Sequence, residues 1–195
     1  MTITAIDPHT ALVLIDLQRG ILGSPTQPYA ATDVLDRAVR LAAGFRAHDL
    51  PVVLVRVTAR PDGSDVTPGR TEVSRPMSRP EGWDLLADKL SGHADDIVVT
   101  KRNWGAFHGT DLDVQLRRRG VTQIVLGGIA TSMGVESTAR AAHEHGYHVT
   151  LATDAMADRS VDMHQHSVDQ IFPRLGETGT TDEILALLEA TPASR

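Results

Sequence analysis

The residues best suited to chemistry are an acid, an amine and a turn without a nucleophile. Asp16 follows the apolar run ALVLI, and Lys101 ends the apolar run DIVVTK. A carboxylate at the end of a buried strand is costly unless it is paired or protonated. Lys101 can supply the opposite charge, so that the pair titrates together and Asp16 can act as a general acid or base. The alternative is a structural ion pair, or an Asp that caps a helix.

The stretch GGIATSMGVESTAR, residues 127–140, predicts the end of a strand, a tight turn and the start of a helix. Backbone N–H groups converge at such a turn and can hold an oxyanion. At the mouth of the helix stands Gly134, where a missing side chain lets a ligand approach the main chain. The chain contains no cysteine, which excludes a thiolate nucleophile and thiolate metal ligands. The structural alternative is a helix capped by Thr131 or Ser132, with Gly134 needed only for packing.

An α/β fold has to position these groups. Apolar runs rich in Val, Ile and Leu, without polar alternation, occupy residues 11–16, 51–57, 96–101, 123–128 and 148–153. Such runs are typical of strands buried on both faces, and hence of a parallel sheet covered by helices. Helical patterns cover residues 32–48, 110–120 and 132–145, and others begin at residue 160 and at the capping box 180–183. In open sheets of this kind ligands bind beyond the carboxyl ends of the strands, where Asp16, Lys101 and the 129–134 turn fall.

Length and composition narrow the class of protein. The 195 residues fit one domain, residues 1–195, and the net charge of −6 with scattered basic residues gives no reason to expect nucleic acid or an anionic membrane as partner. No apolar run approaches membrane-spanning length, and the first ten residues lack the pattern of a signal peptide, so we expect a cytoplasmic protein. Residues 58–82 contain four prolines and few apolar residues, which predicts a functional loop, a lid or a mobile insertion.

Three segments resemble the isochorismatase-like hydrolases, a family that includes isochorismatases, nicotinamidases and N-carbamoylsarcosine amidases. They are ALVLIDLQ around Asp16, TKRNWGAFHGTDLD beginning beside Lys101, and GGIATSMGVESTARAA. The resemblance covers almost the whole chain. It implies a Rossmann-like three-layer α/β/α domain with a mostly parallel central sheet, and a homodimer or homotetramer that needs no cofactor.

In most of this family the catalytic residues are Asp, Lys and Cys. By resemblance Asp16 and Lys101 match the first two, and Gly134 stands at the position of the Cys. The resemblance also implies a cis peptide between Ile129 and Ala130, whose N–H groups would line the oxyanion site, and it makes Ile129, Ala130 and Thr131 candidates for substrate binding. The amidases form a covalent acyl-enzyme, which needs the thiolate. Isochorismatases proper tend to have Gly at this position, since their reaction needs no protein nucleophile.

The resemblance therefore implies a hydrolase that cleaves a vinyl ether such as isochorismate to pyruvate and a dihydrodiol. Asp16 would protonate the substrate, and Lys101 would tune the acid and orient the substrate. Two alternatives stay open: hydrolysis of an amide, imide or ester by activated water, and an inactive member that only binds a small ligand. Isochorismatases also carry an aromatic residue and a His within the turn, whereas this chain has Ala130-Thr131-Ser132-Met133, so the pocket wall differs.

Other side chains are candidates for substrate contact. Trp104 and Phe107 can form an aromatic wall for a ring substrate or pack against the sheet. Gln18 can bind the substrate or hold the turn after Asp16. A substrate carboxylate would need one or two of the arginines that border the long segment, which are Arg56, Arg60, Arg70, Arg75 and Arg79.

The nine histidines do not indicate a metal site. Neither His143/His145/His148 nor His164/His166 gives an i, i+4 pair with a carboxylate. The nicotinamidases bind metal through an Asp-x-His after the second strand, and residues 57–60 lack those ligands. We therefore expect no metal, and histidines of the helices at the surface or half-buried.

Overall fold

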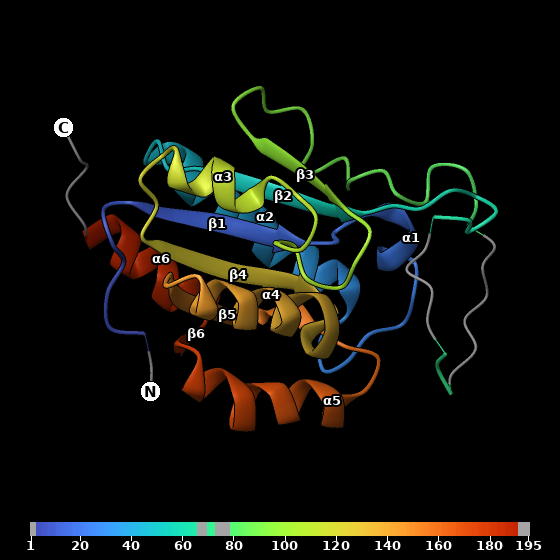
Figure 1. The fold of residues 1–195 in the computed structure, drawn as a ribbon. Coiled ribbons are helices and arrows are strands. Elements are labelled where there is room, and N and C mark those ends of the chain that lie inside the picture. Colours follow the sequence, from blue (N-terminus) through green and yellow to red (C-terminus); the bar gives the residue numbers. More distant parts are fainter. Residues whose placement is uncertain (1–2, 66–69, 73–78, 191–195) are drawn as a thin grey trace.

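A six-stranded parallel sheet forms the centre of the protein (Figure 1). The computed structural model describes residues 3–65, 70–72 and 79–190. The strands lie in the order β3-β2-β1-β4-β5-β6, and every neighbouring pair is parallel. Their bounds are β1 Thr10–Ile15, β2 Val52–Val57, β3 Ile97–Lys101, β4 Gln123–Ile129, β5 His148–Ala157 and β6 Glu177–Gly179. The chain begins in the middle of the sheet, and the direction of winding reverses between β1 and β4.

The five strands predicted from the apolar runs are present, and so is the predicted three-layer α/β/α architecture. The sixth strand, β6, was not predicted. It has only three residues, Glu177–Gly179, and forms the edge of the sheet beside β5. Its sequence ETG contains no apolar residue, so no hydrophobic pattern marks it.

Helices cover both faces of the sheet (Figure 1). Their bounds are α1 Arg19–Leu22, α2 Ala31–Ala47, α3 Leu112–Arg117, α4 Glu136–Glu144, α5 Val161–His166 and α6 Thr181–Ala190. A π-helical turn, η1 Thr131–Val135, precedes α4, and the turns η2 Ser167–Ile171 and η3 Phe172–Arg174 follow α5. The predicted capping box is formed at α6: Thr180 N–H donates to Glu183 Oε2 at 2.7 Å, and Glu183 N–H donates to Thr180 Oγ1 at 3.3 Å.

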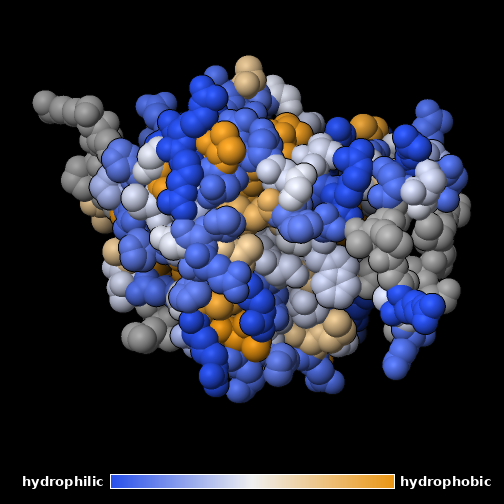
Figure 2. Space-filling view, viewed as in Figure 1, coloured by the Kyte–Doolittle hydropathy of each residue, from blue (hydrophilic) through white to orange (hydrophobic). Residues whose placement is uncertain are grey.

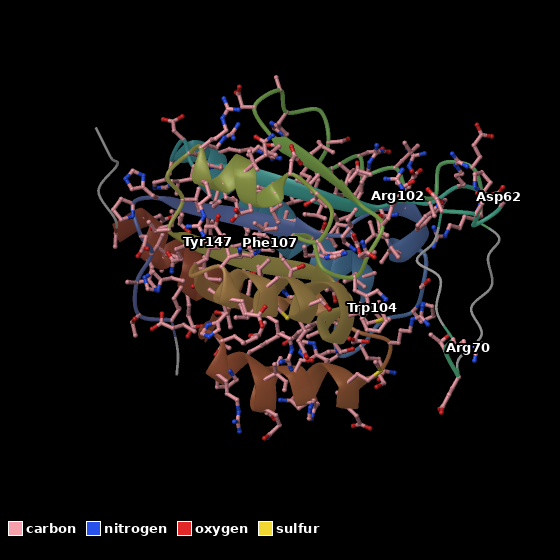
Figure 3. All side chains as sticks on the ribbon, viewed as in Figure 1. Asp62, Arg70, Arg102, Trp104, Phe107 and Tyr147 are labelled. Carbon is pink, nitrogen blue, oxygen red and sulfur yellow. The ribbon has the colours of Figure 1, made fainter. Side chains whose placement is uncertain are left out.

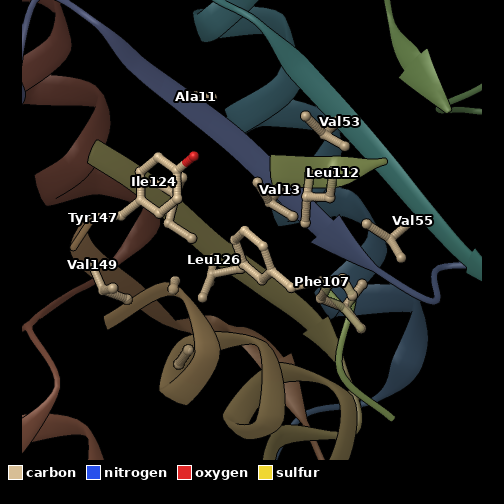
Figure 4. Packing of buried hydrophobic residues seen from close by; sticks show 14 of the residues in the cluster. Ala11, Val13, Val53, Val55, Phe107, Leu112, Ile124, Leu126, Tyr147 and Val149 are labelled. Carbon is tan, nitrogen blue, oxygen red and sulfur yellow. The ribbon is translucent and has the colours of Figure 1, made fainter. Parts of the chain in front are cut away.

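Two hydrophobic cores lie on the two faces of the sheet. Successive residues of β1 alternate between them: Ala11, Val13 and Ile15 join the core under α3 and α4, whereas Leu12 and Leu14 join the core under α2 and α6. Figure 4 shows the first core, in which strand residues pack between the sheet and the helices. Burial on both faces explains why the strands appear in the sequence as unbroken apolar runs.

The outer face of the α3, α4 and α5 layer is mostly hydrophilic. Figure 2 shows hydrophobic side chains there only in small, separate patches. Among the described residues no helix is both long enough and apolar enough to cross a membrane. The parts of the 58–82 segment that the structure describes run beyond the carboxyl ends of β2 and β3, where Asp65 accepts hydrogen bonds from Arg60 N–H and Arg102 Nε.

Candidate active site

Asp16 and Lys101 meet at the carboxyl edge of the sheet. Lys101 Nζ lies 2.8 Å from Asp16 Oδ2 and 3.1 Å from the carbonyl oxygen of Asn103. The two residues are only 6% and 2% exposed, respectively, so the ion pair is shielded from bulk water. Because β2 lies between β1 and β3, the long lysine side chain has to reach across one strand to make this contact.

The backbone at Asp16 turns sharply out of β1. Its φ of 54° lies in the left-handed region, which Asp tolerates better than most residues with a side chain. Its N–H still donates to the Val55 carbonyl oxygen at 2.8 Å, so the residue stays joined to β2. The carboxyl group is thereby fixed at the point where the strand ends.

Burial controls the protonation of Asp16. It raises the pKa of this carboxyl from 3.8 to about 6, because the anion loses its hydration, while the charge and hydrogen bond of Lys101 oppose that shift. Asp16 Oδ1 is buried and has no hydrogen-bond partner in the part of the chain that the structure describes. Since Oδ2 accepts from Lys101, Oδ1 is the oxygen that can carry and deliver a proton.

The turn after β4 lies on the other side of the Asp16 carboxyl group. The peptide bond between Ile129 and Ala130 is cis, as the sequence resemblance implied. Gly134 lies within η1 and is buried. A Cβ added at this position would lie 2.8 Å from Ile15 Cγ2 and 3.4 Å from Asp16 Oδ2. The place where a nucleophilic side chain would begin is therefore directly beside the Asp16 carboxyl.

The comparisons with known proteins decide the family. The family described as "Isochorismatase domain" matches residues 10–183. This chain belongs to the isochorismatase family. The uncharacterized isochorismatase family protein YecD of Escherichia coli O157:H7 is 45% identical over 180 residues, which are 92% of this chain and 96% of YecD.

Two further relatives bear on the fold and on the activity. The solved structure of an isochorismatase family protein from Burkholderia thailandensis superposes with a TM-score of 0.93 at 46% identity, covering 96% of this chain and all of that one (100%). The ureidoacrylate amidohydrolase RutB of Methylorubrum extorquens is 31% identical over 170 residues, 75% of this chain and 68% of RutB. The family and the fold predicted from the sequence are thus confirmed, and the protein is a hydrolase of this family.

The two aromatic candidates of this isochorismatase family member lie in different surroundings. Phe107 is 8% exposed and packs in the core, with its ring centroid 5.0 Å from that of His145 and 5.9 Å from that of Tyr147. Trp104 is 54% exposed, and its carbonyl oxygen would lie 3.6 Å from a Cβ at Gly134. Figure 3 shows Trp104 near the start of α4 and Phe107 over the sheet. These contacts favour packing for Phe107, whereas Trp104 lies exposed next to the site.

Gln18 holds the loops around the site together. Its Nε2 donates to the carbonyl oxygens of Val57 and Trp83 at 3.0 and 3.3 Å, and its Oε1 accepts from Val57 N–H at 2.9 Å. The side chain is fully buried. Because both ends of the amide are engaged with backbone, the contacts favour the turn-holding alternative over substrate binding.

Among the arginines, Arg79 lies beside the same loops. Its guanidinium stacks on the Trp83 ring at 4.3 Å, and its Nη1 is buried without a hydrogen-bond partner among the described residues. Arg56 instead donates from Nε to Thr100 Oγ1 at 3.1 Å. Arg75 lies outside the described residues. Within residues 3–65, 70–72 and 79–190, no group of three or more His, Asp or Glu side chains could hold a metal ion.

Sequence reasoning missed two buried polar residues behind the turn. Asp158 Oδ2 accepts the Ser132 N–H at 2.6 Å, and Thr131 Oγ1 lies 2.9 Å from His164 Nδ1. The expectation of surface or half-buried helical histidines was wrong for His164, which is 4% exposed because α5 packs it against the turn. No signal in the sequence identified Asp158, since it follows the apolar run of β5 as an ordinary loop residue.

Proposed function

We propose that this isochorismatase family member hydrolyses a vinyl ether such as isochorismate, releasing pyruvate and a dihydrodiol. The observation that carries the proposal is a buried acid, Asp16, facing a turn in which glycine replaces the nucleophile. The pKa of about 6 leaves part of Asp16 protonated near neutral pH. Gly134 cannot form a covalent intermediate, so a reaction that requires only proton transfer and water suits the site.

The first step is protonation of the vinyl ether. Asp16 Oδ1 gives its proton to the terminal carbon of the double bond, and the electrons of the ether oxygen form an oxocarbenium ion. Asp16 becomes a carboxylate, which Lys101 Nζ at 2.8 Å from Oδ2 stabilises. Proton donation by a positioned carboxyl group contributes about 10²–10⁴-fold to a rate.

Water completes the reaction. It adds to the oxocarbenium carbon and loses a proton to the Asp16 carboxylate, which restores the acid. In the resulting hemiketal the bond to the oxygen on the substrate ring breaks, the hydroxyl group loses its proton to become the ketone of pyruvate, and the leaving oxygen takes up a proton to become the alcohol.

Four residues take part in the proposal as substrate contacts. Trp104 supplies an exposed aromatic face for the ring, and the Ala130 and Gly134 backbone lines the opposite side. Arg79 binds a substrate carboxylate, which is supported by its buried and unpaired Nη1. Each carboxylate–guanidinium contact would be strong in a site shielded from water.

The proposal also includes the assembly and compartment expected from the sequence. We infer a homodimer or homotetramer in the cytoplasm that works without a metal or another cofactor. Light scattering of the purified protein would measure the assembly, and dialysis against a chelator would leave the rate unchanged.

The test is pyruvate release from isochorismate by Asp16→Asn, which keeps the shape of the side chain but cannot donate a carboxylic proton. We expect a loss of about 10²–10⁴-fold in kcat with substrate binding retained. The matched control is Asp36→Asn, because Asp36 also pairs with a lysine, at 2.6 Å, but is 58% exposed. Full activity of Asp16→Asn would rule the mechanism out.

The similarity to an amidohydrolase supports one alternative, the hydrolysis of an amide, imide or ester, which can be measured with the same purified enzyme. If the wild-type enzyme releases no pyruvate but hydrolyses amides, imides or esters, activated water acts on an acyl group instead. Ligand binding without turnover across all of these substrates would identify an inactive member.

A further inference from the structure

Asp158, directly after β5, holds the turn after β4 although the proposed mechanism does not use it. Its carboxylate is fully buried, with Oδ2 accepting the Ser132 N–H at 2.6 Å and Oδ1 accepting the Arg159 N–H at 2.7 Å. Its own backbone exchanges two hydrogen bonds with Gln27, at 2.8 and 2.7 Å. The carboxylate is therefore fixed from two sides and in turn fixes Ser132.

His164 holds the preceding residue of the turn. Its Nδ1 lies 2.9 Å from Thr131 Oγ1, and the Tyr29 ring stands edge-on to the imidazole with centroids 6.3 Å apart. Burial lowers the pKa of His164, while the charges of Asp158 and Asp169 oppose that shift, so burial favours the neutral ring. Thr131 is itself fully buried. Two successive residues of η1 are thus held by side chains outside the turn: Thr131 by His164 of α5, and Ser132 by Asp158.

The position of this turn sets how closely Gly134 packs against Ile15 and Asp16. A Cβ at Gly134 would lie 2.8 Å from Ile15 and 3.4 Å from Asp16, which leaves little tolerance for movement. A displacement of η1 by about 1 Å would change the distance between bound substrate and acid, and misplacement of that size can cost roughly a hundredfold in rate.

We propose that Asp158 and His164 are positioning residues, which hold the 130–134 turn at the distance from Asp16 that proton transfer requires. The inference rests on the proposed function in taking this turn as a wall of the active site. It does not depend on which bond is hydrolysed, because the turn faces Asp16 with any substrate.

The experiment compares His164→Leu, His164→Asn and Asp158→Asn with the wild-type enzyme. Asn can place a polar atom near the position of Nδ1, whereas Leu cannot. His166→Leu and Asp162→Asn are the matched controls, since both residues lie in the same helix and are exposed. The readouts are amide hydrogen exchange of residues 130–136 and steady-state kinetics on whichever substrate the wild-type enzyme hydrolyses.

We expect His164→Leu and Asp158→Asn to accelerate exchange in the turn by about tenfold or more and to lower kcat by roughly tenfold to a hundredfold, with KM little changed. His164→Asn should recover most of both losses, and the controls should match the wild-type enzyme. Faster exchange with unchanged kcat would show a purely structural contact and overturn the proposal, as would folded variants with wild-type exchange.

The two proposals can fail separately. Absence of pyruvate release combined with hydrolysis of another substrate class would reject the vinyl ether mechanism, while the kinetics of the variants on that substrate would still decide the positioning role. A wild-type enzyme that hydrolyses none of these substrates would overturn both.

Discussion

The protonation of Asp16 predicts a specific dependence of activity on pH. Only the protonated carboxyl can donate, and its pKa is about 6. The protonated fraction falls tenfold for each pH unit well above that value, so that about one site in a hundred is active at pH 8. We therefore expect kcat/KM for pyruvate release to be flat below about pH 5 and to fall tenfold per unit above about pH 7.

Removing the amine should move this profile in a known direction. The charge and hydrogen bond of Lys101 lower the pKa of Asp16 against the larger, opposite effect of burial. In Lys101→Met, the main opposition to the effect of burial is lost, so the decline in kcat/KM should begin at a higher pH than in the wild-type enzyme. Lys89→Met is the matched control, because Lys89 also pairs with an aspartate, at 2.6 Å, but is 62% exposed.

The same ionisation should appear in the free energy of unfolding. Because the folded pKa of about 6 exceeds the value of 3.8 for an unperturbed Asp, the protonated group favours the folded state. This contribution is fully present below pH 3.8 and is lost as pH rises through about 6. The rise of the pKa from 3.8 to about 6 corresponds to roughly 3 kcal/mol. Asp16→Asn should lack this pH-dependent contribution. Urea unfolding of the wild-type protein and the variant at pH 4 and pH 7 therefore measures the contribution of Asp16 to the free energy of unfolding.

The reasoning is refuted by either of two results. A wild-type kcat/KM that already declines above about pH 4 would mean that Asp16 behaves as an exposed carboxyl. A Lys101→Met profile that keeps the wild-type midpoint would mean that the lysine does not control the acid, whatever its distance in the structure.

Three other substitutions test separate parts of the structure. Gly134→Cys places a Cβ 2.8 Å from Ile15 Cγ2, so urea unfolding should show an unfolding free energy lower by about 1–3 kcal/mol. The rate of pyruvate release should also fall. Wild-type values for both would contradict the crowding at this position. Phe107→Ala should cost about 3–5 kcal/mol in unfolding free energy, whereas Trp104→Ala should raise KM with little change in stability, and the reverse pattern would exchange their roles. Thr180→Ala removes the cap of α6 and should lower the unfolding free energy by about 1 kcal/mol; an unchanged urea midpoint would argue against the cap.

The sequence by itself determined the architecture and the chemical types at the site. Unbroken apolar runs predicted five buried parallel strands, because a strand covered on both faces has no polar alternation. The order of Asp16, Lys101 and the 127–140 motif identified the family, and the lack of cysteine excluded thiolate catalysis. The three-residue strand β6 escaped prediction because its pairing with β5 depends on tertiary position rather than on an apolar pattern.

Only the tertiary structure decided how these groups act. Proximity in space cannot be derived from spacing along the chain: Lys101 reaches Asp16 across β2, and the burial of the pair sets the pKa of the acid. Phe107 joins the core, since its place in the fold rather than its type determines its surroundings. The contact of Asp158 with the turn joins residues that are 26 positions apart, through one backbone N–H that no sequence pattern marks.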